Sequence, residues 1–163
     1  MLTLGIDPGT ARLGYGLVED DPQFRAVAFG VVETASSSPM PQRLSELFDA
    51  VSGLIAEHRP ETVAVEQLFF ARNVTNALAV GQARGVVLLA AARAGITVAE
   101  YTPMEVKLAV AGYGKADKPQ MGEMVRMILG LERVPRPDDA ADALAVALCH
   151  AQTAPFARRA AGA

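Results

Sequence analysis

Four carboxylates occupy positions in this sequence from which they could act on one substrate together. Asp7 ends an alternating apolar segment and is followed at once by Pro8 and Gly9, and Glu66 ends a second short apolar segment. Asp139 and Asp142 lie three residues apart, so on a helix they are neighbours on one face. The residues between them are alanines, which would let that face press closely against a sheet.

Carboxylates that converge repel one another, and without compensation some of them would stay protonated. A hard divalent cation provides the compensation. Ligands that are all oxygen, with no His or Cys in these segments, favour Mg²⁺ or Mn²⁺ over zinc. Two such ions about 4 Å apart can activate a water on one side of a phosphate and stabilise the leaving oxygen on the other. The pattern therefore predicts phosphodiester hydrolysis at a two-ion site.

Each acid taken alone has a simpler explanation, as a solvated surface group or a helix cap. Asp138, next to the predicted pair, is interpreted as an N-cap or first-turn acid that the helix dipole favours. Only the joint placement of two strand-end acids and one helical pair favours a metal site.

Apolar periodicity and turn residues predict an α/β domain with a mixed central sheet. Three strands should form an antiparallel meander, and later strands should alternate with helices that cover the sheet. If the strands ending in Asp7 and Glu66 are parallel neighbours, as right-handed crossovers favour, both acids project from one end of the sheet. The expected strands cover residues 2–7, 13–19, 24–33, 62–66 and 96–100, and the expected helices lie between 39 and 59, at 73–94, from 103, at 118–129 and at 138–152.

Length and composition limit the number of domains and the kind of protein that the chain can form. The 163 residues are 51% hydrophobic, enough for one core, so we expect a single domain over residues 1–152 and a flexible tail over 153–163. No apolar run is long enough for a bilayer, and a lone cysteine, Cys149, suits a reducing compartment, so we expect a cytoplasmic protein. The thiol should be buried and inert. His58 and His150 are expected near helix C-termini, where the dipole favours them, rather than in catalysis.

Charge is unevenly distributed along the chain. The formal net charge is −3, but residues 67–126 hold seven basic residues against four acidic ones. Basic groups that share a face could hold phosphates.

Four motifs of the chain, in order, resemble those of the RuvC crossover junction endonucleases. The similarity runs from residue 2 to about residue 152, and the family implies a ribonuclease H-like fold. It also implies a homodimer that resolves four-way (Holliday) junctions in DNA recombination and repair, by symmetric nicks that need Mg²⁺ or Mn²⁺. The motifs lie at residues 5–10 with 14–16, 66–69, 81–85 and 139–145.

The resemblance assigns the site carboxylates to Asp7, Glu66, Asp139 and Asp142. Asp138 offers an adjacent carboxylate at the third position, where the family varies. Alignment through Ala-Ala-Asp-Ala-Leu favours Asp139, as does the argument from the helix face.

The resemblance also indicates DNA-binding residues. Lys107 and Lys118 are similar to family residues near the scissile phosphate, and Phe69 matches an aromatic wedge that stacks on bases at the junction centre. Its neighbour Phe70 packs inside in the simpler interpretation. The remaining candidates are Arg72, which follows the two aromatics, and Lys115, in a Gly-flanked loop that could order on phosphates.

A two-fold junction calls for two sites related by the same symmetry, which favours a homodimer. Ala77, Gly81 and Gly85 form a small-residue stripe that could contact a partner or, equally, pack on the sheet of the same chain. The family also suggests the RuvA–RuvB branch-migration complex as a partner.

Three alternatives compete with this interpretation. The Asp-Pro-Gly-Thr turn is similar to the phosphate-binding hairpin of sugar kinases and actin-like ATPases, but those proteins need roughly twice this length. A small nuclease family of ribosomal RNA maturation shares the first motif but lacks the second and third. The third alternative is a non-catalytic junction-binding module, against which the presence of all four acids argues.

Overall fold

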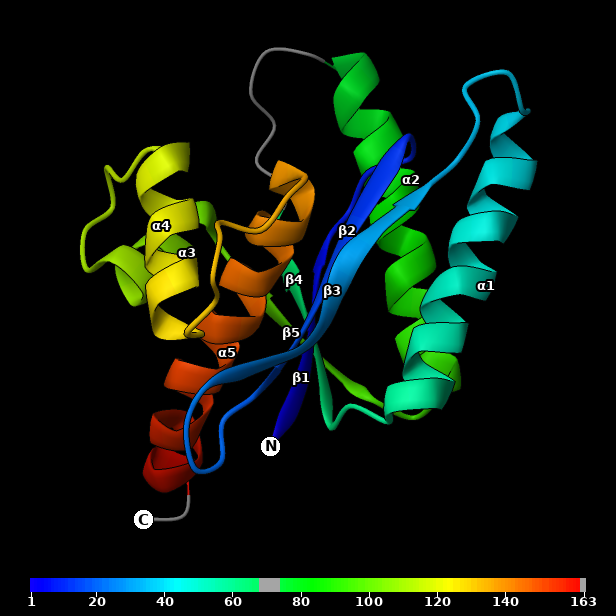
Figure 1. Cartoon of the computed structure of the whole chain (residues 1–163). Helices are drawn as coiled ribbons and strands as arrows, with labels where there is room; N and C mark the ends of the chain where they lie inside the picture. Colours follow the sequence, from blue (N-terminus) through cyan, green and yellow to red (C-terminus); the bar gives the residue numbers. More distant parts are fainter. Residues whose placement is uncertain (68–73, 162–163) are drawn as a thin grey trace.

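The structure is a computed structural model that describes residues 1–67 and 74–161. Within these residues, a five-stranded sheet is flanked by five helices (Figure 1). The elements are β1 (Leu2–Asp7), β2 (Arg12–Glu19), β3 (Arg25–Glu33), α1 (Met40–His58), β4 (Thr62–Glu66), α2 (Val74–Arg93), β5 (Thr97–Tyr101), α3 (Pro103–Ala111), α4 (Lys118–Ile128) and α5 (Asp138–Ala161).

The strand order is β3-β2-β1-β4-β5. The first three strands form an antiparallel meander, and β4 and β5 are added parallel to β1. This confirms the mixed sheet expected from the sequence. Since β1 and β4 are parallel, with Ile6 paired to Val65, the residues that follow, Asp7 and Glu66, leave the same edge of the sheet.

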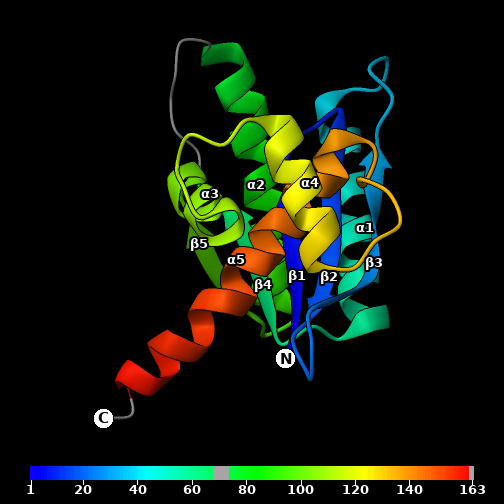
Figure 2. The same cartoon turned by 60° about the vertical axis from the view of Figure 1, so that its left-hand side comes forward.

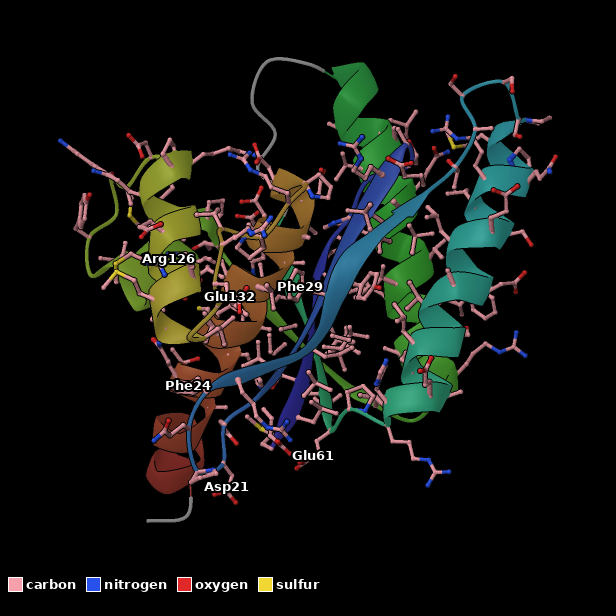
Figure 3. The ribbon with its side chains drawn as sticks, viewed as in Figure 1. Asp21, Phe24, Phe29, Glu61, Arg126 and Glu132 are labelled. Atoms are coloured by element: carbon pink, nitrogen blue, oxygen red, sulfur yellow. The ribbon has the colours of Figure 1, made fainter. Side chains whose placement is uncertain are left out.

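The two faces of the sheet carry different side chains. Leu4 and Ile6 of β1 and Val63 and Val65 of β4 point to one face, where α1 and α2 complete a core cluster. On the opposite face α5 lies against the strands, and α3 and α4 pack against α5, as the two views show (Figures 1 and 2). Phe24, in the β2–β3 turn, packs against this second cluster (Figure 3).

Helix α5 lies directly on the backbone of β1 and β2. A Cβ atom on Gly5 would meet the carbonyl oxygen of Ala143, and one on Gly14 would meet that of Asp139. At Gly16 the same atom would come within 2.8 Å of the Leu144 side chain. The small residues on the acid-bearing face of β1 therefore receive the alanine-rich helix, as the sequence predicted.

The last helix is longer than expected, since α5 continues to Ala161 rather than ending near Gln152. Of the nine residues from 153 to 161, four are alanine and two are arginine, both strong helix formers, which favours continuation of the helix despite Pro155. His150 consequently lies within the helix, not near its end. It is buried, and a 2.8 Å hydrogen bond joins its Nδ1 to the Tyr101 hydroxyl. The dipole explanation is therefore wrong for His150, although His58 does end α1.

Other expectations have separate outcomes. Cys149 is buried, and burial raises the pKa of its thiol to about 12, as expected for an inert thiol. Within residues 1–67 and 74–161, no helix combines the length and the apolar character needed to cross a membrane. The division into a domain at 1–152 and a flexible tail at 153–163 stays a prediction.

We expect Gly5→Ala to destabilise the protein by about 1–3 kcal/mol, because the added methyl group meets backbone atoms of α5 that cannot turn aside. Gly53→Ala is the matched control. Gly53 lies on α1 with open space around it, so the same change there should be neutral or stabilising by up to about 1 kcal/mol. Denaturant unfolding measures both, and equal stability of the two variants would contradict the close packing of α5.

Candidate active site

The acids gather at the carboxyl-terminal edge of the parallel strands, where α5 begins. Asp7 is the last residue of β1 and Glu66 the last residue of β4. Asp139 lies in the first turn of α5 and Asp142 follows one turn later. The contact between Gly14 and the Asp139 carbonyl fixes this end of the helix against the sheet.

Three of the four acids line one pocket of about 380 Å³. They are Asp7, Glu66 and Asp142, and the basic residues Lys107 and Lys118 border the same pocket. The remaining lining residues come from α3, α4 and α5 and the residues preceding them: Pro103, Val106, Asp117, Met121, Ala145 and Val146. The pocket therefore combines carboxylates with cations and an apolar wall.

The electrostatics of this pocket favour added positive charge. Burial raises the pKa of Asp7 to about 7, and the charges of Asp142, Glu66 and Asp139 add to the effect. Burial, followed by the charge of Asp142, also raises the pKa of Glu66, against the opposing influence of Lys118 and Lys107. The protein thus supplies less positive charge than these acids require to ionise normally.

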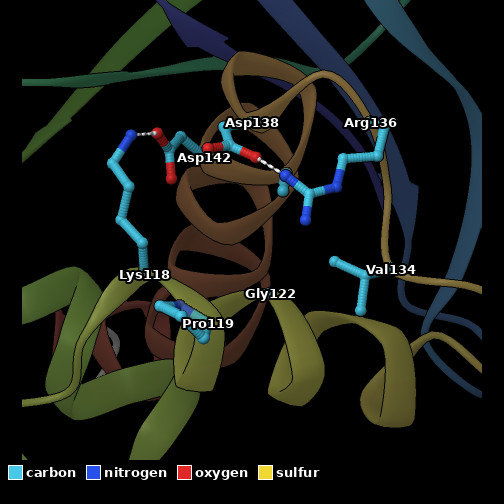
Figure 4. A pocket seen from close by; sticks show the side chains of 8 residues that line it. Lys118, Pro119, Gly122, Val134, Arg136, Asp138 and Asp142 are labelled. Atoms are coloured by element: carbon cyan, nitrogen blue, oxygen red, sulfur yellow. Dashed lines mark hydrogen bonds and ion pairs between the residues drawn. The ribbon is translucent and has the colours of Figure 1, made fainter.

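Two ion pairs supply part of the missing charge. Lys118 Nζ donates to Asp142 Oδ2 over 3.0 Å, and this contact raises the pKa of Lys118 (Figure 4). Arg12 Nη1 donates to Asp139 Oδ2 over 3.3 Å, while its Nε donates to Glu33 Oε1 over 3.0 Å. Asp139 consequently lines a neighbouring shallow concavity with Arg12 rather than the pocket of the other three acids.

The alternative acid at the third position is engaged elsewhere. Asp138 forms an ion pair with Arg136 in the loop before α5 (Figure 4). It belongs to the lining of the concavity that also holds Asp139. Neither Asp138 nor Asp139 lines the pocket of Asp7 and Glu66. The assignment of Asp139 as the third site carboxylate therefore rests on the alignment and the helix face.

The donor set fits a hard divalent cation, because it consists of carboxylate oxygens whose negative charge is incompletely balanced. No group of three or more His, Cys, Asp or Glu within the described residues is arranged to hold a metal as it stands. Lys118 and Arg12 engage Asp142 and Asp139, and a bound cation would compete with these contacts.

The predicted DNA-binding residues have different positions. Lys107 and Lys118 border the pocket of Asp7, whereas Lys115 is exposed on the loop between α3 and α4 and is not among the lining residues. Phe69, Phe70 and Arg72 lie outside the described residues.

Sequence reasoning missed Arg12 and Arg136. Arg12 contacts an acid 127 residues away, and no local pattern connects the two. The available signal was the position of Arg12 at the start of the strand that follows the Asp-Pro-Gly-Thr turn, close to the first acid along the chain.

Comparison with known proteins identifies the family. The family model described as crossover junction endodeoxyribonuclease RuvC matches residues 3–150. A protein of that name from Chloroflexus aurantiacus is 58% identical over 160 residues, which cover 98% of each chain. The solved structure of Thermus thermophilus RuvC superposes with a TM-score of 0.88 at 43% identity, over 96% of this chain and 97% of the other.

A second solved structure, T. thermophilus RuvC in complex with Holliday junction substrate, gives the same TM-score at 42% identity and covers 96% of both chains. The matches extend over both the sheet and the acid-bearing helix. They favour the resolvase interpretation over the kinase-like and ribosomal RNA alternatives. The chain belongs to the RuvC crossover junction endodeoxyribonuclease family.

Proposed function

We propose that this protein resolves four-way DNA junctions by paired symmetric nicks, using divalent ions held by Asp7, Glu66, Asp139 and Asp142. The observation that carries the proposal is that Asp7, Glu66 and Asp142 line one pocket where the parallel strands end. Burial and the neighbouring charges raise the pKa of Asp7 there, as expected where carboxylates call for bound cations. Family membership supports the reaction. The substrate is inferred from the junction that a relative binds in its solved structure.

The carboxylates would hold two ions of Mg²⁺ or Mn²⁺. When bound, such ions supply an activated water and stabilise the leaving oxygen of the phosphodiester. The chain contributes rigidity, since Asp7 and Glu66 end hydrogen-bonded strands and α5 is pressed onto glycines. Lys118 and Lys107, on the rim of the pocket, would hold the phosphate and neutralise part of its charge.

We expect Asp7→Asn to bind a four-way junction but to cut it at a rate reduced by about 100-fold or more, because a neutral amide is a poorer cation ligand. A gel assay should compare a four-way junction, plain duplex and structured RNA, with and without Mg²⁺. Asp49→Asn, the same change on the exposed side of α1, should cut normally. An undiminished rate for Asp7→Asn would remove the basis of the proposal and favour the non-catalytic alternative.

The raised pKa of Asp7 also predicts how stability depends on pH without metal. The folded protein holds the proton at pH values where the unfolded chain has lost it, so ionisation opposes folding. The penalty is absent below the ordinary pKa of 3.8, grows as the pH rises and is complete above about 7.

In EDTA at pH 8, Asp7→Asn should therefore melt about 3–6 °C higher than the wild type, equivalent to about 1–2 kcal/mol. This gain in melting temperature should shrink at pH 5. Saturating Mg²⁺ should remove or reverse it, because Mg²⁺ then stabilises the wild type, whose set of carboxylates is complete, more than the variant. Calorimetry checks this, with Asp49→Asn as the control. A variant that melts below the wild type in EDTA would show that Asp7 is not under electrostatic strain.

We further propose a homodimer through α2. The side chains of Leu78 and Leu89 are 64% and 53% exposed, and Gly85 is exposed between them with open space where a Cβ would lie. The residues of α2 in the sheet-facing core are instead Ala83, Val87, Ala90 and Ala91. Packing of Gly85 on the sheet of its own chain is thus disfavoured, and the exposed apolar stripe suits a second copy.

Leu89→Glu should convert the dimer to a monomer in sedimentation experiments and replace paired cutting by single nicks, because a buried charge opposes the contact. Met127→Glu changes a similarly exposed apolar residue on α4 and should leave the dimer intact. A dimer that survives Leu89→Glu would place the interface elsewhere. The proposals of RuvA–RuvB as partner and of the cytoplasm as the site of action rest on family membership alone.

A further inference from the structure

Three basic side chains surround a shallow concavity beside the pocket of Asp7. Arg12 comes from β2, Lys118 from α4 and Arg136 from the loop before α5. Lys118 also borders the pocket of Asp7, Glu66 and Asp142, so the two depressions lie on either side of its side chain. A chain with net charge −3 that binds a polyanion needs such local concentrations of positive charge.

Each of these cations is paired with an acid of α5. Arg12 contacts Asp139, Lys118 contacts Asp142 and Arg136 contacts Asp138. The pairs are open to water, since the side chain of Arg12 is 44% exposed and that of Asp139 is 31% exposed. Solvent-exposed ion pairs of this kind contribute little stability, so a stronger partner can displace either member.

Arg12 is held by a second acid that takes no part in the proposed cation site. Its Nε donates to Glu33 on the neighbouring strand β3, while Nη1 reaches Asp139. If Asp139 turned to a cation, Glu33 would still hold the guanidinium at the rim of the site with free donors. A planar guanidinium with free N–H groups is suited to binding a phosphate.

We propose that this concavity binds a backbone phosphate of the DNA strand beside the cut, and that Arg12 passes from Asp139 to that phosphate when a divalent ion binds the carboxylates. The inference rests on the proposed function and adds a residue and an order of events to it. While Arg12 contacts Asp139, as it does in this structure, its charge is neutralised and it attracts DNA weakly. Cation binding frees it, so metal and DNA bind cooperatively. The acid paired with Arg136, Asp138, lies outside the cation site, so metal does not change how Arg136 contacts phosphate.

Binding of a labelled four-way junction, measured by fluorescence anisotropy over a series of salt concentrations, tests this in EDTA and in Ca²⁺. In Ca²⁺, Arg12→Gln should bind more weakly, with a plot of log K against log salt shallower by about 0.9, the contribution of one phosphate contact. In EDTA the same variant should match the wild type. For Arg136→Gln the slope of log K against log salt should be shallower both in EDTA and in Ca²⁺.

The chain offers matched controls. Arg25 donates to Glu19 at the opposite end of the β2–β3 hairpin, and Arg133 is exposed in the same loop as Arg136. Arg25→Gln and Arg133→Gln remove the same charge and should leave both slopes unchanged. Neither residue lines the concavity.

Calorimetric titration of the DNA-free protein with Ca²⁺ gives a second measure. Arg12→Gln should bind Ca²⁺ several-fold more tightly, because Asp139 no longer has to leave a guanidinium, and Arg25→Gln should match the wild type. An unchanged Ca²⁺ affinity, an unchanged slope in Ca²⁺ or an equal loss in EDTA and Ca²⁺ would each overturn the exchange. Failure of the proposed function would appear instead in the wild type, as equal binding of four-way junction and plain duplex. In that case the slopes of log K against log salt for the wild type and Arg12→Gln, measured on duplex, would still decide the role of Arg12.

Discussion

The contact between α5 and the glycines of β1 and β2 is the constraint on which the site depends. A helix normally stands off a sheet by the length of its side chains, but Gly5, Gly14 and Gly16 let the backbone of α5 reach the strands. This approach carries the acids at the start of α5 to the edge where β1 and β4 end. Any side chain at these glycines would move the helix, and with it Asp139 and Asp142, two of the four proposed site acids.

The acids brought together in this way oppose folding. Burial, and after it their mutual repulsion, raises the pKa of Asp7 and Glu66. Lys118 and Arg12 supply part of the missing positive charge through their ion pairs with Asp142 and Asp139. Because these ion pairs are exposed, they stabilise the metal-free site only modestly and can be exchanged. If the site binds divalent cations as proposed, the exchange of these ion pairs links cation binding to phosphate binding.

The two faces of the sheet carry different functional surfaces. The face covered by α3, α4 and α5 forms the pocket and the cationic rim. On the other face α1 and α2 bury Leu47, Val51 and Val87 against the strands, while α2 leaves Leu78 and Leu89 exposed outward. A partner copy on α2 would therefore not obstruct DNA at the pocket, which is what two sites on one junction require.

Local sequence determined the strands, most helix limits and the two acids at strand ends, because alternation, helical spacing and turn residues act over a few positions. It also indicated that Asp139 and Asp142 share a helix face. Only the tertiary structure decided that Asp139 turns to Arg12, that Arg136 engages Asp138 and that Gly85 faces outward on α2. Local composition misplaced the end of α5 and the setting of His150, because residues that favour helix continue past Gln152 without an apolar periodicity that would mark them. The contact between Arg12 and Asp139 joins residues 127 positions apart, which leaves no periodic trace in one sequence. Which acid a short-range cation such as Arg136 engages, and which way a helix residue such as Gly85 faces, depends on how the elements pack, so these features are visible only once the chain is folded.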